Sequence, residues 1–210
     1  MKIKSAFFLL SLVMATNVHA LPVIGNADVT DATLSGQTAD GIAFSTANGQ
    51  AGPNGNPSVF NGVFGGTWDL LGKVDSGGNF NSVVNNIGGS ALNLGFTLGA
   101  DQKSGVWSIT SSKNLLLDLV LGIHAGGATA SFLFDDTHLV GGQTQNGTFK
   151  IDWFNNGGNV PAYSNLTEFY GGAQVIPVVS AVPEPATYLM MLAGLGLMGL
   201  LAQRKIKHDN

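Results

Sequence analysis

The sequence predicts an all-β protein whose body is an antiparallel β-sandwich with a jelly-roll-like order of strands. Apolar and polar residues alternate with a period of two in short runs such as 92–98 and 148–153, and this alternation is typical of half-buried strands. Asn-Gly pairs, which favour tight turns because both residues tolerate positive φ, punctuate the body. The body shows no helical period with capping residues, so a helical fold is disfavoured.

The strands follow from these runs. We expect them over residues 58–64, 67–74, 92–98, 106–110, 115–123, 129–134, 148–153 and 166–170. The run 115–123 is apolar apart from Asp118, so it should be a central strand covered on both faces. Residues 21–56 should hold only one or two edge strands, one of them near 41–46. The body is expected to span residues 21–172, with 173–181 as a last strand or a stalk.

The amino-terminal segment, residues 1–20, has the organisation of a secretory signal peptide. Lys2 and Lys4 precede an apolar stretch, and small residues lead to Ala20, the expected cleavage position. The apolar stretch is too short to span a membrane as a helix. The chain contains no cysteine, so disulfides and a cysteine nucleophile are excluded.

The carboxyl-terminal segment combines three features in a fixed order. Val182, Pro183, Glu184 and Pro185 come first, and the prolines favour extended backbone there. Residues 186–202 are uncharged and would span about 25 Å as a helix, at the short end for a transmembrane segment. The tail, residues 203–210, is basic, and the positive-inside rule keeps it in the cytoplasm. Its cations are Arg204, Lys205 and Lys207.

Residues 182–207 resemble the PEP-CTERM protein-sorting signal of Gram-negative bacteria, which is handled by the membrane enzyme exosortase. The alternative is an ordinary carboxyl-terminal anchor with incidental prolines. The resemblance implies that exosortase is a partner, that it recognises Pro183-Glu184-Pro185 and that it cleaves nearby. It further implies a single-pass intermediate in the inner membrane, followed by delivery to the cell surface or the extracellular matrix. The body is loosely similar to the β-rich domains that often precede this signal.

The charge of the body excludes some partners. Residues 21–181 contain four lysines and eleven acidic residues, which gives a net charge of −7. An acidic, charge-poor surface argues against nucleic acid as a partner. The abundance of Gly, Asn, Ser and Thr suits contact with a neutral polymer such as extracellular polysaccharide, although many secreted β-proteins share this composition.

A metal site is one candidate for chemistry in the body. Asp135 and Asp136 stand close to His138 in sequence and could bind a metal with it, and the alternative is a solvated acidic turn. No cofactor is required by the sequence. Calcium is the ion that oxygen-rich turns suit, and Asp28 with Asp31, or Asp135 with Asp136, would supply its ligands.

Aromatic residues are the second candidate, because ring faces stack on the apolar faces of sugars. Tyr163, expected in an exposed loop, and Trp153 are the residues considered for sugar contact. The competing interpretation is that aromatic residues at alternating strand positions belong to the core.

Three classes of function remain. The first is a non-enzymatic surface or matrix protein with a structural, adhesive or polysaccharide-associated role. The second is a secreted carbohydrate-active hydrolase that uses carboxylates, with Glu168, Asp152 and Asp118 as the residues considered. The third is a sugar- or ice-binding module, although the sequence shows no regular array of threonines of the kind that a flat ice-binding face needs.

Overall fold

The computed structural model describes residues 27–46, 55–155, 157–177 and 185–206. The chain divides into two units, one that ends at Ile176 and one that begins at Pro177. The predicted signal peptide and its cleavage position Ala20 lie outside the described residues. We describe the two units separately.

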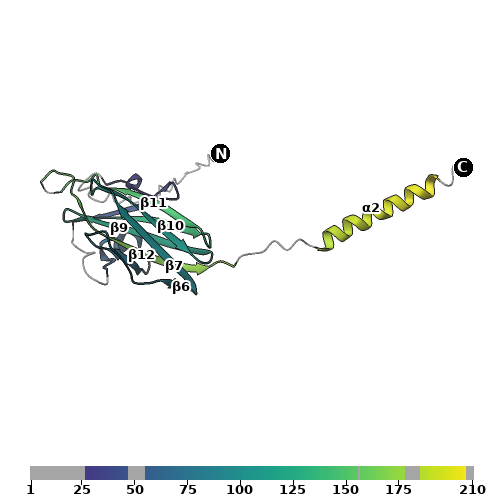
Figure 1. Ribbon diagram of the computed structural model, residues 1–210, viewed down its shortest axis with the longest axis horizontal. Coiled ribbons are helices and arrows are strands. Elements are labelled where there is room, and N and C mark those ends of the chain that lie inside the picture. Colours follow the sequence, from purple (N-terminus) through teal and green to yellow (C-terminus); the bar gives the residue numbers. More distant parts are fainter. Residues whose placement is uncertain (1–26, 47–54, 156, 178–184, 207–210) are drawn as a thin grey trace, which may run out of the picture. The chain divides into compact units, whose positions relative to one another are not determined.

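The first unit contains two antiparallel sheets, each with six strands in the part that the structure describes. Sheet A has the order β2-β1-β11-β8-β7-β6, and sheet B has the order β3-β10-β9-β12-β4-β5. The longer strands of both sheets are labelled in Figure 1. The strands of sheet A are β1 (Ala32–Leu34), β2 (Gln37–Thr38), β6 (Asn86–Ile87), β7 (Ser90–Leu98), β8 (Ser104–Ser111) and β11 (Thr144–Lys150). Those of sheet B are β3 (Gly41–Ser45), β4 (Asp69–Val74), β5 (Phe80–Ser82), β9 (Leu115–Ala125), β10 (Ala128–Leu139) and β12 (Tyr163–Val175).

The two sheets pack face to face around one apolar core, so the predicted β-sandwich is confirmed. Aromatic rings bridge the layers: the ring centroids of Trp107 and Phe134 are 5.6 Å apart, and those of Phe149 and Tyr163 are 6.2 Å apart. The alternate leucines of β9 face this core with the apolar side of sheet A. The jelly-roll order of strands stays a prediction.

The strands predicted over 67–74, 92–98, 106–110, 115–123, 129–134 and 166–170 are all present, and β9, β10 and β12 run further than the sequence pattern indicated. In β9, which lies between β10 and β12, every residue except Leu116 and Asp118 is buried. The expectation of a central strand covered on both faces is therefore confirmed. Residues 173–175, assigned to a last strand or a stalk, form the end of β12.

The predicted strand at 58–64 is wrong, because Ser58–Phe64 forms the helix α1. Its apolar residues at 59, 60, 63 and 64 recur three and four positions apart, which places them on one helical face. Gly65 ends the helix with φ at +68°, a conformation that glycine adopts readily. The run is only two helical turns long, too short for the sequence to distinguish a helix from a strand.

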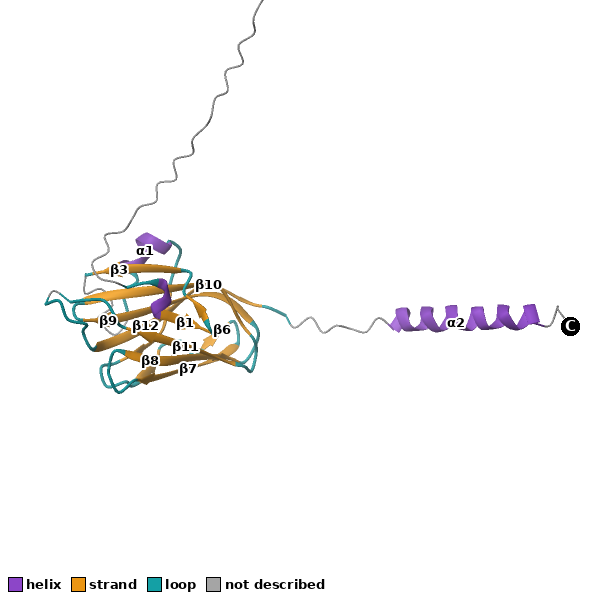
Figure 2. Cartoon of the chain, turned by 90° about the horizontal axis from the view of Figure 1, so that it is seen from above, coloured by secondary structure: helices purple, strands orange, loops and turns teal. Residues whose placement is uncertain are grey.

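Helix α1 covers the outer face of sheet B, where it lies beside β3 (Figure 2). Phe60 is fully buried there, with its ring centroid 5.1 Å from that of Phe169 and 5.6 Å from that of Trp68. Together with Leu70 and Val120 these residues form a second apolar cluster on the far side of sheet B from the main core. Sheet B is consequently buried on both faces in this region.

The second unit contains the helix α2 (Pro185–Ile206). Its large apolar side chains are exposed over the stretch in which side chains are described; Met190, for example, is 75% exposed. No helix in the described ranges is both long enough and apolar enough to cross a membrane.

Candidate functional site

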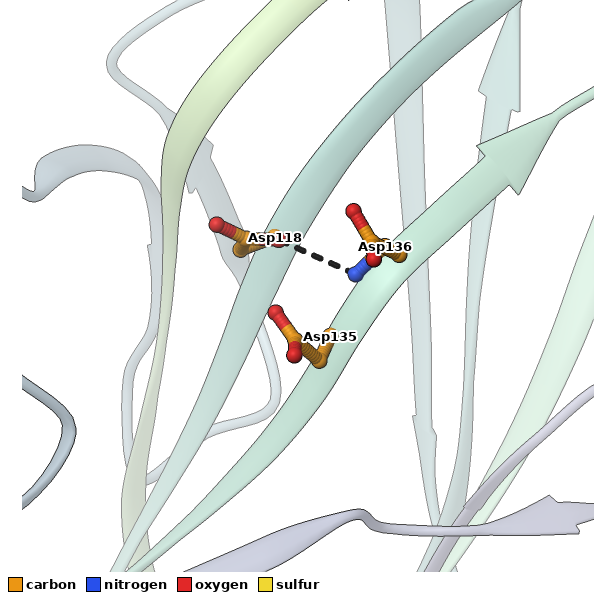
Figure 3. A group of neighbouring side chains, drawn as sticks. All are labelled: Asp118, Asp135 and Asp136. Atoms are coloured by element: carbon orange, nitrogen blue, oxygen red, sulfur yellow. Dashed lines mark hydrogen bonds between the residues drawn. The ribbon is translucent and has the colours of Figure 1, made fainter.

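Three aspartates meet on the outer face of sheet B where β10 carries a bulge. The register of β10 against β9 shifts between Phe134 and Thr137, so Asp135 and Asp136 both stand opposite Asp118 (Figure 3). One carboxylate oxygen from each of the three lies within 4.8 Å of the others. Bulges of this kind re-aim side chains, and two residues here face one on the partner strand.

Backbone N–H groups of the bulge hold two neighbouring carboxylates in place. The N–H of Asp136 donates to Asp118 Oδ1 at 3.0 Å, and the N–H of Asp135 donates to Asp40 Oδ2 at 2.9 Å. Asp136 has φ at +47°, which is uncommon for a residue other than glycine. The bulge therefore fixes a fourth carboxylate, that of Asp40, beside the group of three.

The close spacing of the three carboxylates determines their protonation. The hydrogen bond to Asp118 raises the pKa of the Asp135 carboxyl above its ordinary value, and slight burial and the Asp118 charge act in the same direction. Like charges at this distance disfavour simultaneous ionisation. A divalent cation would relieve that repulsion, and carboxylate oxygens are the ligands that calcium prefers. The group can thus hold a cation or share protons.

His138 does not belong to this group in the structure. It pairs with Leu116, two steps further along the β9–β10 ladder than Asp118. It lines a hollow of about 420 Å³ with Asp40, Asp135 and Gln145. The sequence analysis groups Asp135 and Asp136 with His138, whereas the structure groups them with Asp118. Asp118 is distant along the chain and reaches them only through strand pairing.

The other candidate calcium ligands, Asp28 and Asp31, make structural contacts within the chain. They form a capping box at the short helix η1 (Val29–Asp31). Asp31 Oδ1 also lies 2.9 Å from the Lys150 ammonium, and Asp152 Oδ2 lies 2.9 Å from the same group. Burial raises the pKa of the Asp31 carboxyl.

The expectation that Tyr163 is exposed in a loop is wrong. Tyr163 begins β12 and is only 6% exposed, and its hydroxyl donates to the carbonyl of Val74 at 3.1 Å. Trp153 is fully buried in the core and makes an edge-to-face contact with Phe44. Neither ring offers a face to a sugar, so the competing core interpretation holds for both residues.

Glu168, considered for hydrolysis, lies between the two sheets. It pairs with Leu121 of β9 and Gly72 of β4 and is 2% exposed. Neither of its carboxyl oxygens has a hydrogen-bond partner among the residues that the structure describes, and burial raises its pKa to about 8. No local pattern around Glu168 indicates this burial, because residues 166–170 show only the features of a strand.

The sorting segment is described only in part. Val182, Pro183 and Glu184 lie outside the described residues, as does Lys207, whereas Pro185 begins α2 and Arg204 and Lys205 lie within it. A β-sandwich followed by a separate carboxyl-terminal helical unit is an architecture that joins a folded body to a terminal module.

Comparison with known proteins identifies that module. A family model described as the PEP-CTERM protein-sorting motif matches residues 181–205, so the chain carries this motif and the resemblance drawn from the sequence is confirmed. The motif supports exosortase-dependent sorting of a surface protein. Comparison with curated proteins and with solved structures found no significant match.

Proposed function

We propose that the protein is exported, held briefly in the inner membrane by its carboxyl-terminal segment, and delivered by exosortase to the cell surface or the extracellular matrix. There it has a structural or adhesive role in contact with extracellular polysaccharide and performs no catalysis. The match of residues 181–205 to the sorting motif carries this proposal.

Two further observations support it. The described apolar side chains of α2 are exposed, and contiguous exposed apolar surface calls for a lipid or protein partner. The basic residues Arg204, Lys205 and Lys207 follow the apolar stretch, which favours a cytoplasmic carboxyl end. Both fit a temporary hydrophobic tether.

The decisive experiment replaces Pro183, Glu184 and Pro185 together by alanine and follows the protein by cell fractionation and apparent mass. The variant should remain in the inner-membrane fraction at its unprocessed mass. The matched control is Pro177→Ala, which lies outside the motif and should be processed like the natural protein. If the triple variant reaches the same fraction at the same mass as the control, processing at this motif is refuted.

Calcium binding to the body stays a prediction. Its support is the placement of Asp118, Asp135 and Asp136 within 4.8 Å of one another. Its test is thermal unfolding of the natural protein and of Asp135→Asn, each with calcium and with a chelator.

A further inference from the structure

The outer face of sheet A carries short, uncharged side chains in rows that run across the strands. One row is fixed by strand register: Thr38 of β2 pairs with Thr33 of β1, Thr33 with Thr148 of β11, Thr148 with Val106 of β8, and Val106 with Thr97 of β7. Three strands lie between the two ends of this row, and 59 positions separate Thr38 from Thr97 in the sequence. Only the fold brings these residues into line.

Two more rows run parallel to the first, each two residues further along the strands. They consist of Asn146, Ser108 and Gly95, and of Thr144, Thr110 and Asn93. Neighbouring strands lie about 4.8 Å apart and alternate residues of one strand about 7 Å apart, so the rows form a two-dimensional lattice of hydroxyl, amide and methyl groups. We call this surface the threonine face.

Contacts between the side chains order the threonine face before any partner arrives. The hydroxyls of Thr33 and Thr148 are 2.7 Å apart, and those of Thr110 and Thr144 are also 2.7 Å apart. The backbone N–H of Thr148 donates to the Thr33 hydroxyl at 3.1 Å. Side chains that are already fixed lose little entropy on binding, which favours affinity.

The three rows contain no ionisable side chain. The next outward residue of β11, Lys150, is held between the carboxylates of Asp31 and Asp152 at 2.9 Å from each. Within these three rows of described residues a charged partner would therefore find no opposite charge, and it would have to give up hydration without compensation. An uncharged partner meets no such penalty.

The threonine face is not flat. Two hollows, of about 420 and 340 Å³, share Thr97 and Val106 as lining residues. The first extends to Thr148 and the second to Ser108 and Asn146. Val106 is 48% exposed between them, so an apolar contact lies amid hydroxyl and amide groups. This alternation matches a sugar chain, which presents hydroxyls at its edges and C–H groups on its ring faces.

We propose that the threonine face is the binding surface for a neutral polysaccharide, with the chain lying across β11, β8 and β7. Hydroxyls and amides both donate and accept, as sugar hydroxyls do, and the methyl groups of threonine and Val106 pack against sugar C–H groups. This inference rests on the proposed location in the extracellular polysaccharide, but its test uses purified protein, so sorting and binding can fail independently.

The test is co-sedimentation of the full-length protein, purified in detergent, with insoluble cellulose, β-1,3-glucan and chitin, and with alginate gel as an acidic comparator. We expect retention on at least one neutral polymer and none on alginate. Because no charge takes part, retention should not weaken when the salt concentration is raised about tenfold.

Two matched variants locate the surface. Val106→Arg places a long cation at the centre of the face and should lower the bound fraction at least about tenfold. Val83→Arg is the control, because Val83 is 57% exposed beside the edge strand β5 of sheet B, and it should bind like the natural protein. Thr148→Val removes a hydroxyl with little change of shape and should weaken binding to a smaller extent, and it keeps the test valid if Val106→Arg lowers the melting temperature.

Four outcomes would overturn the proposal. These are retention on none of the neutral polymers, equal loss of binding in both arginine variants, salt-sensitive binding to alginate, and a stable dimer that Val106→Arg dissociates. Growth-shaping of ice crystals without retention on any glycan would assign the face to ice instead and would refute a polysaccharide partner.

Discussion

The outer faces of the two sheets differ in almost every respect. Sheet B is covered by α1, and Phe60, Leu70, Val120 and Phe169 are buried in the contact. Sheet A presents the threonine face, where Thr97, Thr144 and Thr148 are exposed. The strands differ accordingly: β9 is apolar at most positions, whereas in β11 exposed residues alternate with less exposed ones. One outer face contributes to stability, and the other is free to contact a partner.

The largest effect on stability is expected from ionisation of Glu168. This residue belongs to sheet B, the more buried of the two sheets, and therefore sharpens the contrast between them. Its pKa rises from 4.5 to about 8 on burial, so the folded state holds the proton more tightly than the unfolded chain does. The contribution of Glu168 to the free energy of unfolding is therefore fully present below pH 4.5, and it is lost as the pH rises to about 8. The loss amounts to at most roughly 5 kcal/mol. Urea unfolding at pH 5 and pH 9 measures it.

Glu168→Gln should show almost none of this pH-dependent loss, because it has no proton to release. Asp69→Asn is the control on the neighbouring strand β4, since Asp69 is exposed, and it should retain the loss seen in the natural protein. An equal loss in Glu168→Gln and in the natural protein would show that the Glu168 carboxyl is hydrated or paired.

Removing Phe60 should break the covered face. Phe60→Ala deletes a fully buried ring that contacts Phe169, Trp68 and Phe64. The expected cost is about 3–5 kcal/mol in the free energy of unfolding. Val63→Ala in the same helix, where Val63 is 46% exposed, should cost less than about 1 kcal/mol. Similar melting temperatures for the two variants would mean that α1 does not seal sheet B.

Asp135→Asn tests the acidic bulge at the end of the covered face. The raised pKa of Asp135 means that ionisation of this carboxyl destabilises the folded state, so without calcium the variant should be slightly more stable at pH 7 and unchanged at pH 3. Solvent screening keeps the gain below about 1 kcal/mol. Calcium should raise the melting temperature of the natural protein more than that of the variant. Identical melting of the natural protein in calcium and in chelator would remove the calcium prediction.

The smallest effect on stability is expected from a substitution on the threonine face. Thr148→Val keeps a β-branched side chain on β11 and loses one exposed hydroxyl contact to Thr33. Its free energy of unfolding should stay within about 0.5 kcal/mol of the natural value, as measured by urea titration. A loss above 2 kcal/mol would indicate that this face supports the fold rather than a partner.

The β-sandwich could be predicted because each of these strands has a recognisable local sequence pattern. Residues 92–98 and 115–123 show their burial through alternation and through continuous apolar character, so the outcome needed no knowledge of the partners. The prediction for residues 58–64 is wrong because the run is short. Two helical turns and one strand of this length show similar patterns of apolar residues. The order of strands in each sheet depends on long-range pairing, which no local pattern specifies.

The sites were predictable only where they are contiguous in sequence. The sorting motif at 181–205 is a continuous segment and was found directly. The sequence predicts that Asp135 belongs to an acidic group. The third member of that group, Asp118, lies on the neighbouring strand β9, opposite the bulge in β10. The threonine face cannot be recognised in the sequence, because its residues come from five different strands. Tyr163 was misplaced because a loop-like sequence around it conceals the start of β12.

The position of β12 has a mechanical consequence. It is the last strand of the sandwich, it lies between β9 and β4, and the sorting segment follows it. A pull on the carboxyl end therefore loads two ladders of hydrogen bonds together in shear, whereas an edge strand would peel open one bond at a time. In the proposed tethered state, with the body adhering to a matrix, traction would load both of these ladders. Single-molecule stretching from the carboxyl end should record a high rupture force in one step.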